Sequence, residues 1–361
     1  MTVLEPTDDG YLKGFDLELR NDDGSREHRL VFIEETPTVP LSSAPVWVFP
    51  NDPALPALKT LVDPVSTELE LARLGVETSA PSSQLVTYRP GRRAVLRIPT
   101  SRASIYVKVV APGKAAAIAE RHDQFRSATL PVPRLLGWSH DGVVVLSELP
   151  GVDAQAAVGA MKDHELFLDQ LEFLSTLLAD VPAISTARAS LFDRLDWYVE
   201  RLSAHLPGDS ARIASLGDAI ARWGAYGRGF EHTPVTIHGD LHLGQLFVDP
   251  VNPCLISGML DIDTSGSGDP ADDAAAFYAH LIALGETARV VDAVYTAACL
   301  ALAASWLARW RRNRNAGFEA RCRAIAATHL LGHSLRPMGS DGDAVSTRLL
   351  DHAAALVAGA P

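Results

Sequence analysis

The sequence predicts an α+β protein of two lobes, a β-rich N-terminal lobe and a mainly helical C-terminal lobe. Short runs of β-branched residues, separated by turn residues, fill most of the first 148 positions. After Gly151 the pattern becomes rich in Ala and Leu at helical spacing, except for an island at 235–273 where short strands alternate with polar turns. A chain of 361 residues also buries its surface more readily in two lobes than in one oversized core.

The first element is a β-hairpin. Residues 15–19 alternate between apolar and polar, Asp23-Gly24 is a strong hairpin turn, and 30–33 forms the return strand. We expect residues 1–82 to form this hairpin and a cap-like extension of the small lobe. The hairpin serves either as a cap on that lobe or as a dimer contact.

A connector dense in proline follows the hairpin. It has room for a short strand at 46–49 but for no long helix, because proline removes a backbone donor and clashes with the preceding turn. Residues 55–74 are largely helical in pattern, with an interruption at Pro64.

Residues 83–148 are predicted to form a nucleotide-binding N-lobe, and residues 149–361 a helical C-lobe that carries the catalytic loop and the acceptor site. In the N-lobe a helix opens near Pro112-Gly113 and runs to Phe125. The strands expected around it are 84–88, 94–98, 104–110, 133–137 and 143–146.

Composition excludes several classes of protein. The 32 Lys and Arg residues stand against 44 Asp and Glu residues, a formal net charge of −12, which argues against a nucleic-acid partner because such affinity comes from neutralising phosphates. The three cysteines have no CxxC spacing, and the N-terminus has no signal-peptide pattern. The longest apolar stretch, near 293–307, is too short to cross a bilayer. We expect a cytoplasmic protein with no membrane partner, and its oligomeric state stays open.

The polar island holds the densest group of chemically useful residues. It begins with His238-Gly239-Asp240 and continues through Gln245. Twenty-one residues after Asp240 comes Asp261, within Leu260-Asp261-Ile262-Asp263. Both aspartates directly follow short apolar strands, an arrangement that aims two carboxylates into one cleft.

These residue types suit phosphoryl transfer. Asp240 can accept the proton of an attacking hydroxyl, while Gln245 and Asp261 offer the oxygen ligands that Mg²⁺ prefers. Lys108, inside an apolar strand, can neutralise phosphate charge, and Glu120 on the next helix is its expected partner.

The motif HGD-x-H-x-G-Q-L, the later LDID and GDP, and the strand with Lys108 resemble the aminoglycoside phosphotransferase and choline kinase-like family, relatives of protein kinases. The resemblance implies a protein-kinase-like fold and ATP- and Mg²⁺-dependent phosphorylation of a small-molecule hydroxyl. The implied roles are Asp240 as catalytic base, His238 as support of the catalytic loop, Gln245 and Asp261 as metal ligands, Lys108 and Glu120 as a phosphate-binding ion pair, and Ser147, Glu148 and Leu149 as the interlobe hinge that meets adenine.

The sequence departs from the family pattern at three places. Most members have Asn where Gln245 stands, and the Gln form resembles the maltokinase and glucosamine kinase branch, which mildly favours a sugar acceptor. The sequence after Asp261 differs from the one usual in that branch. No glycine-rich loop precedes Lys108, and a turn with the single glycine Gly91 occupies its place. We expect Arg92 or Arg93 to supply charge to the nucleotide phosphates instead.

The acceptor stays open among amino sugars, neutral sugars, aminoglycosides, amino alcohols and a Ser/Thr-bearing peptide. Asp263 either lines the acceptor pocket or caps a turn. Acidic residues such as Asp263 and the Asp341/Asp343 segment suit an aminated acceptor. Asp269, directly before Pro270, is predicted to be a helix N-cap.

Two other functions compete with a kinase. A metallohydrolase would bind zinc through His238, Asp240, His242 and Asp261, since His-x-Asp-x-His is a plausible ligand spacing. Against it, His242 is better explained as a loop-stabilising residue. No second histidine cluster is predicted, because the other candidates lie in separate helical stretches: His280, His329, His333 and His352. The third function is a catalytically silent nucleotide-binding protein of the same fold.

Overall fold

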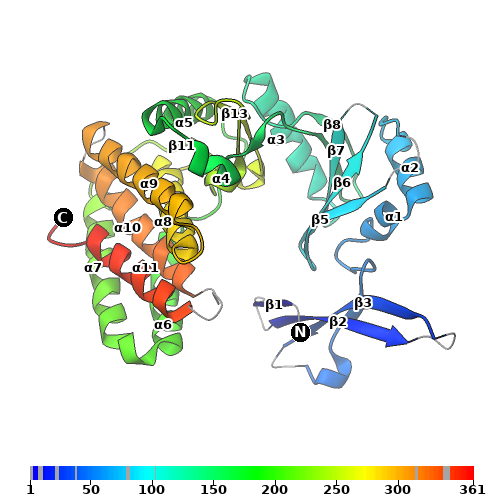
Figure 1. Ribbon diagram of the computed structural model, residues 1–361, viewed down its shortest axis with the longest axis horizontal. Helices are drawn as coiled ribbons and strands as arrows, with labels where there is room; N and C mark the ends of the chain where they lie inside the picture. The colour runs from blue at the N-terminus through cyan, green and yellow to red at the C-terminus, as the bar shows by residue number, and fades with distance from the viewer. Residues whose placement is uncertain are drawn as a thin grey trace. The chain divides into compact units, whose positions relative to one another are not determined.

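The computed structural model (Figure 1) describes residues 3–6, 11–20, 24–36, 39–78, 82–101, 103–313, 316–335 and 342–361. The chain divides into two units. The first comprises Met1–Asp123 and Pro133–Glu148, and the second comprises Gln124–Val132 and Leu149–Pro361. The β-rich first unit and the helical second unit confirm the predicted α+β class.

The first unit begins with a four-stranded antiparallel sheet. Its strands, in spatial order, are β1 (Val3–Pro6), β2 (Tyr11–Arg20), β3 (Arg26–Glu35) and β4 (Val46–Val48). The register Arg20↔Arg26 through Tyr11↔Glu35 confirms the predicted hairpin, and Gly24 in its turn has a left-handed φ of 82°. Phe32 is buried against Trp47 and Tyr88, at ring-centroid distances of 5.8 and 5.4 Å, so this sheet packs on the start of the next one.

The second sheet of this unit has five strands. They are ordered β5 (Gln84–Arg89), β6 (Arg93–Pro99), β7 (Ser104–Val110), β9 (Val143–Ser147) and β8 (Leu135–Trp138). Because side chains alternate along a strand, Val107 and Val109 pack with α1 (Leu58–Val62) and α2 (Pro64–Arg73).

The opposite face of this sheet packs against α3 (Ala115–Ser127). Val110 and Val144 lie on that face, and Lys108 belongs to it because its cross-strand partner is Val144. The helical interruption expected at Pro64 is confirmed, since Asp63 caps α2 by accepting a hydrogen bond from the Ser66 N–H at 2.8 Å.

The second unit is built mainly from helices. They are α4 (Ala154–Ala157), α5 (His164–Ala179), α6 (Leu195–His205), α7 (Ser210–Arg228), α8 (Pro270–Ala288), α9 (Ala293–Asn313), α10 (Ala316–Ser334) and α11 (Gly342–Leu356). Short 3-10 helices are η1 (Leu41–Ser43) in the first unit and η2 (Val158–Ala160), η3 (Leu191–Arg194), η4 (Pro207–Asp209), η5 (Leu243–Gln245) and η6 (Ile262–Thr264) in the second. Helix α10 packs against α7, α8 and α11, and α8 packs against α9.

The predicted island forms two small sheets in the second unit. β12 (Leu246–Val248) lies between β10 (Val152–Asp153) and β13 (Ile256–Met259), while β11 (Val235–Ile237) pairs with β14 (Gly266–Gly268). β14 was not predicted, because Gly-Ser-Gly has no apolar residue to signal a strand. Its glycines fit a crowded position, where a Cβ on Gly266 would lie 2.5 Å from the Ser185 carbonyl oxygen.

Helix α9 contains the one window of the described chain, Ala293–Trp310, that is long and apolar enough to cross a membrane by length and composition. The expectation that the apolar stretch near 293–307 is too short was therefore wrong, because the helix continues to Trp310 and beyond. Core helices of soluble proteins meet the same criterion, and here Cys299, Leu302 and Trp306 are buried in the helical core. The expected absence of a membrane partner therefore stays a prediction.

Candidate active site

The HGD segment, His238-Gly239-Asp240, follows β11 and is held by hydrogen bonds to Asp273 and Leu260. His238 is fully buried; its backbone N–H donates to Asp273 Oδ2 at 2.7 Å, and its ring Nε2 lies 2.8 Å from the Leu260 carbonyl oxygen. Because a carbonyl oxygen only accepts, Nε2 carries the ring proton. His238 therefore acts as a positioning residue, in line with its expected supporting role.

Asp273, in the first turn of α8, is the anchor of this segment. Its second oxygen accepts a hydrogen bond from the Gly239 N–H at 2.8 Å. Burial raises the pKa of Asp273. The nearby His238 and the two backbone hydrogen bonds act in the opposite direction but do not cancel this increase. Gly239 has a φ of +79°, and a Cβ there would lie 2.5 Å from the Thr264 carbonyl oxygen, so the turn requires glycine.

Asp240 lies half-buried beside a cation that the sequence did not reveal. Arg188 Nη1 is 3.2 Å from Asp240 Oδ1. Arg188 reaches this place because its segment runs along β14: its own N–H donates to the Thr264 carbonyl oxygen, and the neighbouring Ala187 N–H donates to the Ser267 carbonyl oxygen, both at 3.0 Å. No motif marks Arg188, and only the tertiary pairing of residues far apart in the chain identifies it.

Gln245 and Asp261, the predicted metal ligands, are joined through the backbone of Leu260. The Leu260 N–H donates to the Gln245 carbonyl oxygen at 2.7 Å, and the Leu260 carbonyl accepts from His238. Asp261 follows with a left-handed φ of 51°, a conformation uncommon for any residue but glycine and enriched at functional sites. The carboxylate and the side-chain amide oxygen supply hard ligands, so the donor set fits Mg²⁺.

His242 stabilises the same loop. Its Nδ1 accepts a hydrogen bond from the Gly244 N–H at 3.1 Å, and its Nε2 lies 3.2 Å from the side-chain amide nitrogen of Gln245. This arrangement supports the loop-stabilising interpretation of His242.

In the first unit Lys108 is 7% exposed, on the face of the sheet that packs against α3. Glu120 lies on α3 but is exposed, because the buried face of that helix is formed by Ala115, Ile118 and Ala119. The pairing of Glu120 with Lys108 stays a prediction. The predicted phosphate-binding role of Lys108 is independent of that pair and stays a prediction.

The turn expected to replace a glycine-rich loop is held by a buried carboxylate. Asp52, 2% exposed, accepts hydrogen bonds from the Tyr88 hydroxyl at 2.8 Å and from the Gly91 N–H at 2.7 Å. Burial raises the pKa of Tyr88, so its hydroxyl remains a donor at neutral pH. The Gly91 N–H is thus already bonded within the protein, while Arg92 is exposed next to it.

The expected hinge residues lie where one unit ends and the other begins in the chain. Glu148 is the last residue of the first unit and Leu149 the first of the following segment of the second. Ser147 Oγ accepts from the Arg134 N–H, and Glu148 Oε2 accepts from the Ser104 N–H, both at 3.0 Å. Their proposed contact with adenine stays a prediction.

The remaining predicted residues have mixed outcomes. Asp269 caps α8 by accepting from the Ala271 N–H at 3.0 Å, as expected, and also forms an ion pair with buried Arg321. Asp263 is half-buried in η6, which leaves its acceptor role open. Asp343 is exposed at the start of α11, and Asp341 lies outside the described residues.

The zinc site considered for a metallohydrolase is not formed by the described residues. Within the described chain His238, Asp240, His242 and Asp261 do not form a group of converging ligand atoms. The expectation that no second histidine cluster exists was wrong, because α8 and α10 bring His280, His329 and His333 together. The three histidines lie in separate helical segments of the sequence, but the packing of α8 against α10 brings them together.

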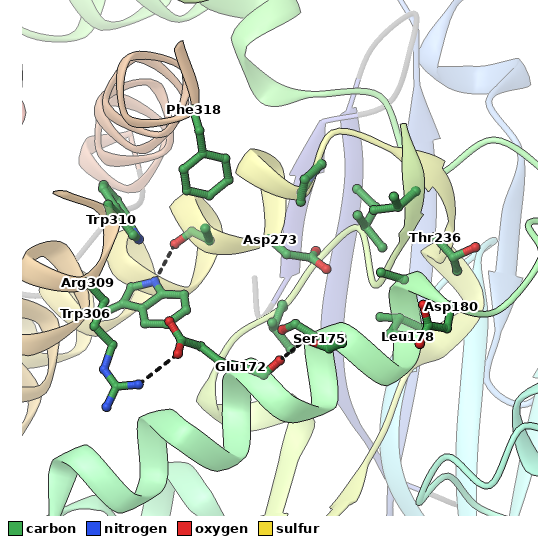
Figure 2. Close-up of a pocket in the computed structure, with 17 residues that line it drawn as sticks. Glu172, Ser175, Leu178, Asp180, Thr236, Asp273, Trp306, Arg309, Trp310 and Phe318 are labelled. Carbon is green, nitrogen blue, oxygen red and sulfur yellow. Dashed lines mark hydrogen bonds and ion pairs between the residues drawn. The ribbon is translucent and has the colours of Figure 1, made fainter. Parts of the chain in front are cut away.

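A cavity of about 230 Å³ in the second unit (Figure 2) is lined in part by Ile237 and Leu241, which flank the HGD segment. Asp273 lines it together with Thr236, Trp306 and Arg309. The guanidinium of Arg309 is bound by the carboxylates of Glu165, Asp169 and Glu172 at 2.7 to 3.0 Å. Since that charge is already neutralised, this cavity does not offer a phosphate site.

Comparison with known proteins agrees with this geometry. The sequence profile of the phosphotransferase enzyme family matches residues 70–314, a range that contains Lys108, Asp240, Gln245 and Asp261. No curated protein sequence matches the chain significantly.

The similar solved structures include several of aminoglycoside phosphotransferase APH(4)-Ia. A thermostable mutant in ternary complex with ADP and hygromycin B is 15% identical, with a TM-score of 0.54, covering 81% of this chain and 99% of that one. Another, with AMP-PNP and hygromycin B, is 15% identical with a TM-score of 0.52, covering 81% and 97%. A third structure of APH(4)-Ia is 13% identical with a TM-score of 0.51, covering 81% and 98%.

Proposed function

Because the chain belongs to the phosphotransferase enzyme family and is a small-molecule kinase, we propose that it transfers the γ-phosphoryl group of ATP to a hydroxyl of an amino sugar, a sugar or an aminoglycoside-like acceptor. The observation that carries the proposal is the backbone of Leu260, which joins His238, Gln245 and Asp261 into one loop assembly beside Asp240.

In this mechanism the acceptor oxygen attacks the γ-phosphorus while the bond to the β-phosphate oxygen breaks, and ADP leaves. Asp240 accepts the hydroxyl proton, and Arg188 holds its carboxylate in place. Gln245 and Asp261 are the proposed ligands of Mg²⁺, which would neutralise charge on the nucleotide phosphates. Positioning and electrostatics supply most of the rate in such a transfer.

The acidic character of the site favours an aminated acceptor. Asp240 follows β11 and Asp263 lies in η6, and these two segments are in contact because the Thr264 hydroxyl donates to the His238 carbonyl oxygen at 3.0 Å. The whole chain carries a formal net charge of −12. The similar APH(4)-Ia structures were solved with hygromycin B, an observation on those proteins that supports testing this class first.

An ADP-release screen tests the proposal. Wild-type protein is incubated with ATP, with and without Mg²⁺, and with amino sugars, neutral sugars, aminoglycosides or amino alcohols. We expect Mg²⁺-dependent ADP release with at least one class, and none with Asp240→Asn. A rise in Tm on adding ATP, with no phosphorylated product from any acceptor, would instead favour the catalytically silent alternative.

A further inference from the structure

Three histidines that have no role in the proposed phosphoryl transfer meet inside the helical unit. His280 is on α8, and His329 and His333 are on α10, the two helices that pack side by side (Figure 1). The spacing of four residues places His329 and His333 on one face of α10. One ring nitrogen from each of the three lies within 4.8 Å of the other two.

The distances suit a transition-metal ion. Zinc binds histidine nitrogen at about 2.0–2.1 Å, so the nitrogens of a tetrahedral site lie about 3.3 Å apart. Closing the present triangle to that size requires each nitrogen to move by less than about 1 Å, a small side-chain adjustment. The rings are already close in edge-to-face arrangements, with His280 4.6 Å from His333 and 6.2 Å from His329 between centroids.

The surroundings favour such a site over a solvated group of histidines. His329 and His333 are only 8% and 6% exposed, and His280 is partly exposed, which leaves a path for an ion. Three neutral imidazoles select Zn²⁺, Cu²⁺, Ni²⁺ or Co²⁺ over Mg²⁺, which prefers oxygen ligands. The site is therefore chemically distinct from the proposed magnesium ligands Gln245 and Asp261.

We propose that His280, His329 and His333 bind one divalent transition-metal ion of the zinc class, which ties α8 to α10. Three protein ligands leave one coordination position for water or an anion. The site lies under the catalytic loop, because the His280 ring stacks on His242 with centroids 4.4 Å apart and an interplanar angle of 18°. The proposal depends on these three side chains and not on the proposed kinase activity.

Metal binding to the untagged, metal-stripped full chain tests this directly. We expect calorimetric titration with ZnCl₂ to give one ion per chain, and Co²⁺ to give the visible absorption of a low-coordinate histidine complex. An excess of MgCl₂ should not displace either ion. At a zinc concentration about 100-fold above Kd, Tm should rise by about 3–6 °C, and EDTA should reverse the rise.

Variants identify the ligands. His280→Ala and His329→Ala should each weaken zinc binding at least about tenfold, whereas His205→Ala, an exposed histidine on α6, should bind as wild type does. His280 is only partly buried, so we expect His280→Ala to fold. This variant therefore tests the site even if His329→Ala does not fold. The absence of stoichiometric zinc or cobalt binding in the wild type, or unchanged affinity in His280→Ala, would overturn the proposal.

Discussion

Replacing Asp273 should detach the catalytic loop from the helix beneath it. Its carboxylate, on a residue only 7% exposed, accepts the N–H groups of His238 and Gly239 at 2.7 and 2.8 Å. Asp273→Ala leaves both groups without that acceptor, at about 1–3 kcal/mol each, so the free energy of unfolding should fall by about 2–6 kcal/mol. Asp273→Asn keeps one acceptor oxygen, and about half that loss is expected.

Thermal denaturation followed by circular dichroism measures the loss, with about 1–2 °C of Tm for each kcal/mol in a chain of this length. Because the loop also carries Asp240, the kcat for ADP release should fall in both variants even at temperatures where they remain folded. The adjacent carboxylate provides a matched control: Asp272 accepts from the Ser190 hydroxyl and not from the loop, so Asp272→Asn should keep kcat. Wild-type Tm and kcat in Asp273→Ala would refute the anchoring role.

Three further outcomes follow from individual contacts. Arg188→Ala removes the cation 3.2 Å from Asp240 and should lower kcat about tenfold or more, with little change in Tm since the pair is partly exposed; unchanged steady-state kinetics would contradict this. Burial raises the pKa of Asp272 to about 7, so the folded state keeps a proton that the unfolded chain loses above pH 4. Through this group, Tm should fall as the pH rises from 4 to 7. A pH series on Asp272→Asn should lack that slope. Asp52→Ala leaves the Tyr88 hydroxyl and the Gly91 N–H without their buried acceptor and should destabilise the protein by about 2–4 kcal/mol in urea unfolding, a result that a wild-type midpoint would exclude.

Local patterns predicted the elements well where they carry a periodic or turn signal. The hairpin around Gly24, the break at Pro64 and the strands of the island follow from alternation, fixed proline geometry and short apolar runs. The same signals failed for β14, whose Gly-Ser-Gly segment pairs only because Val235–Ile237 lies beside it.

The site residues that were missed depend on tertiary contacts. The sequence pattern did not single out Asp273, yet its carboxylate accepts hydrogen bonds from residues 34 and 35 positions earlier in the chain. Arg188 meets Asp240 from a segment with no motif. The spacing of His329 and His333 indicates a shared helix face, but the third histidine, His280, comes from another helix, which no local pattern can reveal.

The exposure of Glu120 also could not be predicted from the sequence. Glu120 was chosen by its position on the helix after Lys108, and the rotation of α3 exposes it instead. The sequence of α3 is short and polar, so its pattern of apolar residues does not determine which residues face the sheet. The localisation, the acceptor and the role of the N-terminal sheet stay predictions.

The most direct test of the account measures Asp240 itself. With the acceptor found in the screen, ATP affinity and single-turnover phosphoryl transfer are measured for wild type, Asp240→Asn and Asp240→Ala. The account predicts that both variants bind ATP nearly as wild type does but transfer no measurable phosphoryl group, because the acceptor hydroxyl has lost its proton acceptor. Phosphoryl transfer at the wild-type rate by Asp240→Ala would contradict it.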